Sequence, residues 1–106
     1  MIYSIKITQK AKNDIINIFE YVTFKLCAPQ AAANLVGKIE SAIRSLDTMP
    51  FRFAKYSSKT PELSETRIMN VDNYLVFYIP NKDEGVVNVI RVIYGGRDID
   101  EVLGNK

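Results

Sequence analysis

The sequence has 106 residues, of which 47% are hydrophobic and 25% charged, with a formal net charge of +2, and this indicates one soluble domain over residues 1–106. A lone cysteine, Cys27, rules out an internal disulfide and favours the cytoplasm, and because histidine is absent the sequence predicts no zinc site, no Cys–His nucleophile and no cofactor. No apolar run approaches the roughly 18 residues of a membrane span, and the N-terminus lacks the order of a signal peptide, so no membrane contact is expected.

The first half of the sequence predicts one strand and two amphipathic helices. Residues Ile2–Ile7 alternate in polarity as a short strand does, and Thr8 can cap the helix that follows. Pro29 suits the first turn of a second helix, which Pro50 stops. Gly37 lies inside this second helix at a cost of about 1 kcal/mol relative to alanine, so we interpret it as a mark of close helix–helix contact. The apolar residues of both helices recur every three or four positions: Ala11, Ile15, Ile18, Phe19, Val22 and Leu26, then Ala32, Leu35, Val36, Ile39, Ile43 and Leu46. Two such helices joined by a few residues predict an antiparallel helical hairpin.

The second half of the sequence is β-rich. Residues 51–65 have no clear period and are interpreted as a long loop. Three strand patterns with short turns follow: Thr66–Val71, Tyr74–Ile79 and Val86–Tyr94. The last of them is apolar on both faces, which is typical of a central strand. Asp98 and Glu101 then resemble the start of a short helix. The order β-α-α-β-β-β-α predicts an α+β fold, a small antiparallel sheet with the hairpin on one face and the other face open to solvent, a ligand or a partner.

The stretch "RVIYGGRDIDEVL", residues 91–103, ends the long strand in an unusual way. Gly95 and Gly96 are expected to turn the chain sharply without side chains in the way. Tyr94 and Arg97 are then displayed on either side of the turn, at the rim of the open sheet face.

Residues 73–103, "NYLVFYIPNKDEGVVNVIRVIYGGRDIDEVL", resemble the RelE/ParE superfamily, the toxins of bacterial type II toxin–antitoxin modules. They carry its aromatic strand, acidic turn, Val-rich strand ending in Arg-Val, and Gly-Arg-Asp element. The segments "EYV" at 20–22 and "MPFRFA" at 49–54 are similar to that family as well. The resemblance implies the same helical hairpin and sheet, and a cognate antitoxin as partner, and it leaves open a toxin homodimer or a heterotetramer with the antitoxin.

The resemblance implies one of two activities. RelE-like members cut mRNA at the ribosome, whereas ParE-like members inhibit DNA gyrase and cut no RNA. Metal-free RNA cleavage needs a base, cations for the phosphorane charge and an acid for the leaving oxygen. Arg67 and Arg97 match two basic positions of the RNA cutters. Two other basic positions are occupied here by Met69, which is taken as outward-facing, and by Leu75. Leu103 stands where the RNA cutters have a tyrosine. This favours the ParE-like activity, with the mRNA endoribonuclease and an inactive relative that only binds antitoxin as alternatives.

The candidate target-binding residues are basic or aromatic side chains of the loop and the strand ends: Arg52, Lys55, Arg67, Arg91, Tyr94 and Arg97. For a ribonuclease, the catalytic candidates are Arg67, Tyr94 and Arg97. Arg67, Arg91, Tyr94 and Arg97 are expected to lie together at one end of the open sheet face. Structural roles stay open, above all a salt bridge for Arg91, which lies in a strongly apolar strand. The loop cations Arg52, Lys55 and Lys59 are interpreted first as solvated charges. The alternative is that, with Phe51, Phe53 and Tyr56 between them, they widen the contact for nucleic acid or protein.

Overall fold

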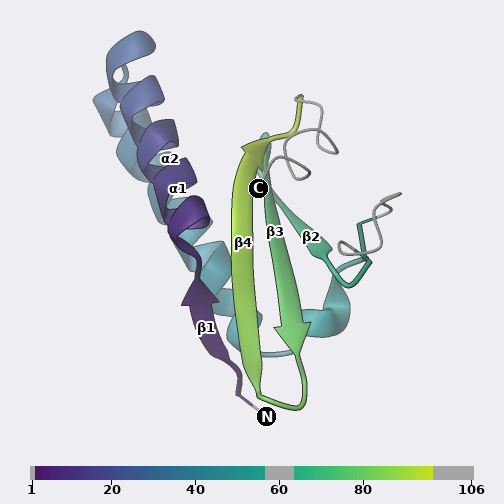
Figure 1. Cartoon of the computed structure of the whole chain (residues 1–106). Helices are drawn as coiled ribbons and strands as arrows, with labels where there is room; N and C mark the ends of the chain where they lie inside the picture. The colour runs from purple at the N-terminus through teal and green to yellow at the C-terminus, as the bar shows by residue number, and fades with distance from the viewer. Residues whose placement is uncertain (1, 57–63, 97–106) are drawn as a thin grey trace.

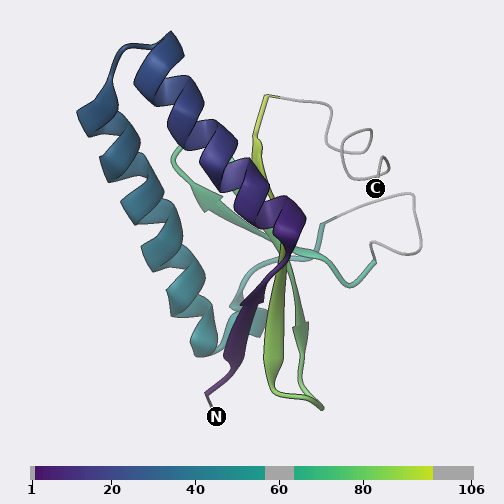
Figure 2. The same ribbon diagram turned by 60° about the vertical axis from the view of Figure 1, so that its left-hand side comes forward.

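Two helices lie on one side of a four-stranded sheet in the computed structural model, which describes residues 2–56 and 64–96 (Figures 1 and 2). The strands are β1 (Ser4–Ile7), β2 (Arg67–Val71), β3 (Tyr74–Asn81) and β4 (Val86–Tyr94), and the helices are α1 (Gln9–Glu20) and α2 (Pro29–Arg44). The strand order is β1-β4-β3-β2, with β1 parallel to β4 and the other pairs antiparallel. The predicted α+β fold with a helical hairpin on one face is confirmed. The short helix expected from Asp98 lies outside the described residues.

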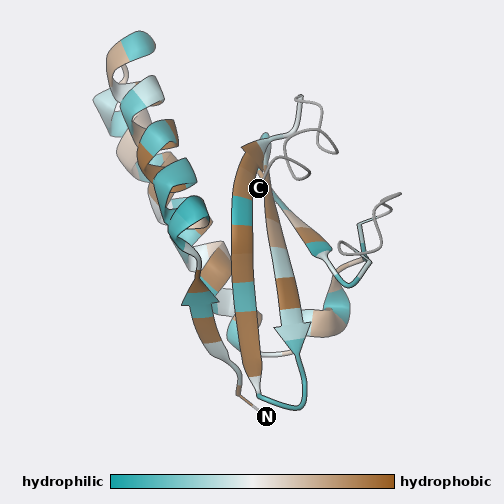
Figure 3. Ribbon diagram, in the orientation of Figure 1, coloured by the Kyte–Doolittle hydropathy of each residue, from teal (hydrophilic) through white to brown (hydrophobic). Residues whose placement is uncertain are grey.

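Strand β4 lies inside the sheet, between β1 and β3, and most of its length is hydrophobic, which Figure 3 shows as brown bands interrupted by teal ones. Val89 pairs with Tyr78 and Arg91 pairs with Phe77, so Ile90 is an extra residue in a β-bulge. Side chains alternate along a regular strand, and Val89 and Val92 would therefore point to opposite faces without the bulge. With the bulge, both pack in the core beneath the helices.

Helix α1 begins where the sequence predicts, because the Thr8 hydroxyl accepts a hydrogen bond from the Ala11 N–H (3.1 Å). The helix continues into a turn of π-helix, η1 (Tyr21–Lys25), in which the Leu26 N–H donates to the Tyr21 carbonyl. The extra residue in this turn breaks the α-helical period of the apolar stripe. Val22 stays buried, whereas Leu26, which was expected to extend the stripe, is 56% exposed.

Helix α2 starts at Pro29, as predicted, and ends at Arg44, before Pro50. The interpretation of Gly37 as a helix–helix contact is wrong, because Gly37 is exposed and a Cβ atom there would meet no atom within 4 Å. The close contacts of α2 are made by its other face, through Ala32, Ile39 and Ile43.

We therefore expect Gly37→Ala to raise the free energy of unfolding by about 0.5–1 kcal/mol, since alanine loses less backbone entropy in a helix and meets no obstacle here. Urea unfolding monitored by circular dichroism measures the change. The matched control is Ala33→Gly at another exposed position of α2, which should lower stability by a similar amount. A Gly37→Ala variant less stable than the parent would contradict the open surroundings of Gly37.

The sheet face opposite the helices is less open than the sequence predicts, because it carries an apolar cluster of its own. Phe77 and Ile93 are buried there, and Tyr56, Ile68, Leu75 and Ile90 pack around them. Part of the predicted loop adds to the sheet edge at this point: the Tyr56 N–H donates to the Thr66 carbonyl (2.7 Å) and the Ile68 N–H to the Ala54 carbonyl (3.2 Å). Residues 57–63 of that loop lie outside the described residues. In the part of the chain that is described, no helix has both the length and the apolar character needed to cross a membrane.

Candidate functional site

A groove of about 720 Å³ lies between the helical hairpin and the end of β4. It forms because β1 ends at Ile7, opposite Val89, whereas α1 runs on beside the last residues of β4. We call this feature the groove and define it by its two walls. Asp14, Asn17, Ile18, Tyr21, Val22, Leu26 and Leu35 line the helical wall, and Asn73, Tyr74, Arg91, Val92, Ile93 and Tyr94 line the sheet wall.

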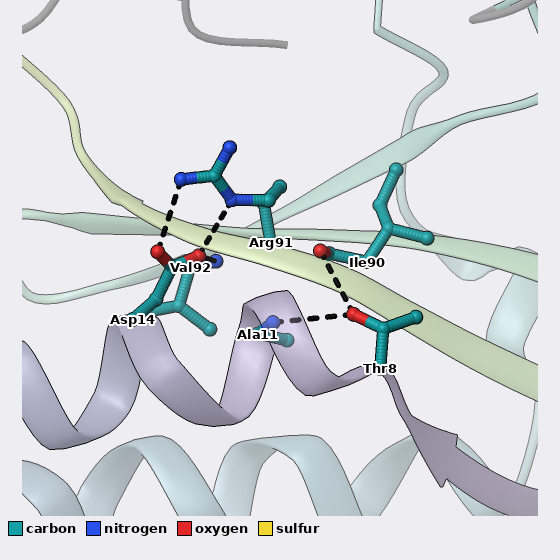
Figure 4. A network of polar contacts seen from close by, with 6 residues as sticks. All are labelled: Thr8, Ala11, Asp14, Ile90, Arg91 and Val92. Carbon is teal, nitrogen blue, oxygen red and sulfur yellow. Dashed lines mark hydrogen bonds and ion pairs between the residues drawn. The ribbon is translucent and has the colours of Figure 1, made fainter. Parts of the chain in front are cut away.

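An ion pair between Asp14 and Arg91 joins the two walls (Figure 4). Arg91 donates from Nε to Asp14 Oδ2 (2.8 Å) and from Nη2 to Asp14 Oδ1 (3.0 Å), and the Val92 N–H donates to Oδ2 as well (2.9 Å). The Asp14 and Arg91 side chains are only 14% and 19% exposed. The hydrogen bond to Asp14 raises the pKa of Arg91, so the guanidinium stays charged. Arg91 therefore forms a salt bridge, which is the structural role that its sequence context left open.

Helix α1 and its N-cap residue, Thr8, also supply the hydrogen bonds that a strand would make at this edge of β4. Thr8 donates from its N–H to the Val89 carbonyl (3.0 Å) and from its hydroxyl to the Ile90 carbonyl (3.1 Å), and Asp14 then accepts from the Val92 N–H. Beyond β1, the backbone of β4 would otherwise present unpaired groups at a sheet edge. Thr8, the N-cap of α1, and Asp14 within the helix thus satisfy backbone groups of β4 where no strand pairs with them.

The sheet wall of the groove is aromatic. The rings of Tyr74 and Tyr94 meet edge to face with their centroids 5.6 Å apart, and Tyr94 is half exposed. Burial, followed by the neighbouring phenols of Tyr94 and Tyr21, raises the pKa of Tyr74, so this phenol remains neutral and able to donate a hydrogen bond. These rings give the groove wide apolar surfaces with polar edges.

The two glycines after Tyr94 make room for close neighbours. A Cβ atom on Gly96 would lie 2.8 Å from Cε2 of Tyr94, and one on Gly95 would lie 3.3 Å from the Asn73 carbonyl oxygen. Among the described glycines only Gly85 has a positive φ, so Gly95 and Gly96 are not required here for a left-handed turn. Gly96 instead allows the Tyr94 ring to lie against the backbone.

The helical wall ends in exposed apolar side chains that the sequence did not identify as functional. Tyr21, Phe24 and Leu26 lie in or next to the π-helical turn, and all three are more than half exposed. Turns of this kind occur often at functional sites. The periodicity of the sequence gave no sign of it, since an apolar residue at position 26 fits an uninterrupted α-helical stripe.

The structure divides the predicted target-binding residues into two groups. Arg91 and Tyr94 line the groove, whereas Arg67 lies on the outer strand β2, level with Arg91 along the sheet but on the far side of β3. Arg67 pairs with Tyr78 and Tyr94 pairs with Tyr74, which places them four residues apart along β3, a separation of about 13 Å. The expectation that they meet at one end of the sheet face is therefore wrong. Arg97 and Lys59 lie outside the described residues.

The second group surrounds a short 3₁₀ turn, η3 (Pro50–Arg52). Arg52 donates from Nη1 to the Thr48 carbonyl (2.6 Å), and Arg67 donates from Nη1 to the Phe53 carbonyl (2.6 Å). Lys55 pairs with Glu65 at 3.3 Å on the surface. Both arginines are thus ordered by backbone carbonyls.

The aromatic residues of this region differ in their exposure and contacts. Phe53 packs edge to face on the core residue Tyr78, and Tyr56 packs in the same way on Phe77. Phe51 remains 43% exposed. Phe51 is therefore the aromatic side chain among these three that is most available to a partner.

The surroundings of Met69 and Leu75 bear on whether this sheet could carry an RNA-cleaving site. Met69 is buried in the core beneath the helices, so the interpretation of residue 69 as an outward-facing position is wrong. Leu75 packs in the apolar cluster of the opposite face. Within residues 2–56 and 64–96, no three His, Cys, Asp or Glu side chains come close enough to hold a metal ion. Leu103 lies beyond these residues.

A family model described as "ParE toxin of type II toxin-antitoxin system, parDE" matches residues 5–99 of the chain. A search of curated protein sequences gave no match.

Solved structures with a similar fold come from several toxin–antitoxin systems. The chromosomal ParDE system from P. aeruginosa is 19% identical with a TM-score of 0.71, over 88% of this chain and 96% of that chain. The toxin–antitoxin complex RelBE2 from Mycobacterium tuberculosis is 21% identical with a TM-score of 0.61, over 89% and 99%. A mutant of the E. coli toxin RelE in the free state is 14% identical with a TM-score of 0.67, over 98% and 93%. At these identities the likeness establishes the fold.

Proposed function

This chain belongs to the ParE toxin family of type II toxin–antitoxin systems, and we propose that it slows bacterial growth by binding DNA gyrase and that a cognate antitoxin neutralises it. The observation that carries the non-nucleolytic part of the proposal is the environment of Leu75. RNA cutters in the superfamily that the sequence resembles carry a cation at this position, but Leu75 packs among apolar side chains. Met69 faces the core beneath the helices and does not bear on this comparison. Since each lost cation or donor costs several kcal/mol of transition-state stabilisation, this sheet is poorly equipped for RNA cleavage.

The groove supports the antitoxin part of the proposal. Its lining is mainly apolar and aromatic, and its two lining charges, Asp14 and Arg91, neutralise each other. Leu26 and Tyr94 are at least half exposed, so a partner that covers them removes apolar surface from water. An antitoxin segment with apolar side chains fits such a groove. Among the solved relatives, RelBE2 is itself a toxin–antitoxin complex.

Ribosome-dependent mRNA cleavage is the second candidate, because Arg67 matches a basic position of the RNA cutters and the fold is shared with E. coli RelE. The guanidinium of Arg67, however, donates to the carbonyls of Phe51 and Phe53, on the side of the sheet that carries Met69. It is therefore tied to the turn at η3 and supports RNA cleavage weakly.

Induction of the chain in a bacterial host separates the candidates. We expect DNA synthesis to stop and a DNA-damage reporter to rise, while cellular mRNA stays intact, and we expect the purified chain to inhibit supercoiling by purified gyrase. Mapping of RNA 5′ ends after induction is the decisive measurement. Codon-phased cuts in translated messages would replace gyrase inhibition by mRNA cleavage, and unchanged growth would identify an inactive relative. Co-expression of the antitoxin is the control and should restore growth.

A further inference from the structure

The turn that leads into η3 holds a methionine in a strained and exposed position. Met49 has φ 49° and ψ 53°, which is the left-handed region, and its side chain is 74% exposed. A residue with a Cβ atom is disfavoured in this region, which glycine and asparagine adopt more readily. Packing does not explain the choice of methionine, because most of the side chain contacts solvent. Strain of this kind often marks a functional surface.

Arg52 fixes the strained turn. Its Nη1 donates to the carbonyls of Thr48 (2.6 Å) and Met49 (3.1 Å), and its Nη2 donates to the Ser45 hydroxyl (3.1 Å). These bonds join the end of the second helix to the turn, so Met49 is held in one backbone conformation before any partner arrives. A side chain held in this way loses little further freedom on binding.

Phe51 is held on the same turn by two contacts. Its ring meets Tyr3 edge to face with centroids 6.3 Å apart, and Cζ of Arg67 lies 5.1 Å from the ring centroid. Arg67 also donates from Nη1 to the carbonyl of Phe51 (3.2 Å). An aromatic ring that is 43% exposed is thus fixed beside an exposed methionine.

The charges beside this turn are not balanced by carboxylates. Ion pairs in the described part of the chain involve Lys38, Lys55 and Arg91, and none involves Arg52 or Arg67. Their hydrogen bonds to uncharged carbonyl and hydroxyl groups order both guanidinium groups but leave their positive charges unneutralised. The complementary surface is one that brings carboxylates next to an apolar pocket.

We propose that Met49, Phe51, Arg52 and Arg67, the Met49 surface, contact the protein target of the toxin, through an apolar pocket of that target edged by carboxylates. This assignment rests on the proposed function, because it requires a toxin with a protein target. Phe51 lies away from the groove: its ring meets Tyr3 edge to face, just before β1 at the Val86 end of β4, whereas the groove lies at the Tyr94 end. Arg67 is the part of the Met49 surface that lies level with the groove residue Arg91, on the far side of β3. Target and antitoxin are therefore contacted by different parts of the toxin.

A protein fits the Met49 surface better than a nucleic acid does. Methionine, aromatic residues and arginine are the side chains enriched at the centre of protein interfaces. Methionine offers neither a flat ring for stacking on a base nor a donor for a phosphate. Both terminal nitrogens of Arg52 already donate within the turn, which leaves them poorly placed for the two-pronged contact with phosphate that arginine usually makes.

The test is Met49→Asn, because asparagine tolerates the left-handed backbone and removes the apolar anchor. We expect an unchanged or higher melting temperature, at least about 10-fold weaker binding to purified DNA gyrase, and slower loss of growth on induction. Affinity for the antitoxin should not change. Ile16→Asn, at an exposed apolar position of α1, is the matched control and should keep full gyrase binding and toxicity.

Other outcomes have defined meanings. Unchanged gyrase affinity and full toxicity in a folded Met49→Asn variant would overturn the Met49 surface. If the parent chain binds no gyrase but still slows growth, and Met49→Asn weakens that effect, the surface stands and the proposed target is wrong. Binding of a single-stranded RNA oligonucleotide by the parent, lost in Met49→Asn, would replace the protein target by a nucleic acid. A parent chain that neither slows growth nor binds gyrase contradicts both proposals.

Discussion

An aspartate in place of Leu26 should prevent neutralisation by the antitoxin while the toxin still slows growth. Leu26 lines the groove and is 56% exposed, so the free protein tolerates the change with little loss of packing. In the complex the new carboxylate would be covered by apolar side chains with no partner charge, which costs on the order of 3 kcal/mol or more. We therefore expect the affinity for the antitoxin to fall by at least about 100-fold.

Calorimetry with the purified antitoxin and growth of cells that express both proteins measure the two effects of Leu26→Asp separately. Leu26→Met conserves volume and should keep neutralisation. Phe24→Asp is the matched control, because Phe24 is exposed on the same turn but does not line the groove. Neutralisation lost equally with Phe24→Asp would show a general effect of negative charge at the hairpin tip. Unchanged affinity with Leu26→Asp would remove the groove as the antitoxin site.

Asp14→Ala should lower the free energy of unfolding by about 3 kcal/mol or more, which is large for a domain of this size. The change removes the carboxylate that pairs with the partly buried guanidinium of Arg91 and that accepts from the Val92 N–H. It also removes one of the hydrogen bonds that join α1 and its N-cap to the edge of β4. Urea unfolding at neutral pH gives the measurement.

A double-mutant cycle isolates the Asp14–Arg91 pair. Arg91→Ala in the Asp14→Ala background should cost less than in the parent, because the Asp14–Arg91 ion pair is already absent there. Lys38→Ala is the comparison, since the Lys38–Asp72 pair is exposed and its loss should cost less than about 1 kcal/mol. Equal losses in the free energy of unfolding from Asp14→Ala and Lys38→Ala would contradict the inference that the Asp14–Arg91 pair stabilises the fold more than an exposed pair does.

Local chemistry in the sequence determined the elements of the fold. The hydroxyl of Thr8 caps α1, the ring of Pro29 starts α2, and the apolar residues on both faces of Val86–Tyr94 predicted its central place in the sheet. Each of these signals acts over a few residues and needs no knowledge of distant contacts. The motif around residues 73–103 carried the family resemblance in the same way, because its residues follow one another along the chain.

Features that depend on distant segments were decided only in three dimensions. The bulge at Ile90 lets Val89 and Val92 share one face, and the π-helical turn exposes Leu26, although either stretch fits a regular element on its own. The prediction that Gly37 marks a helix–helix contact was wrong for a related reason. Whether a glycine faces another helix or solvent depends on what packs around its helix.

For the candidate sites as well, the sequence indicated individual residues, and only the tertiary structure brought them together. Arg91 and Tyr94 stood out in the sequence by residue type, but nothing linked them to Tyr21 or Leu26, which are about 70 positions away along the chain. The groove exists because α1 extends past the end of β1 along β4, and Asp14 replaces the missing strand at that edge. Pairing between segments so far apart is set by the packing of the whole sheet and hairpin, so residue types could be read from the sequence and their meeting could not.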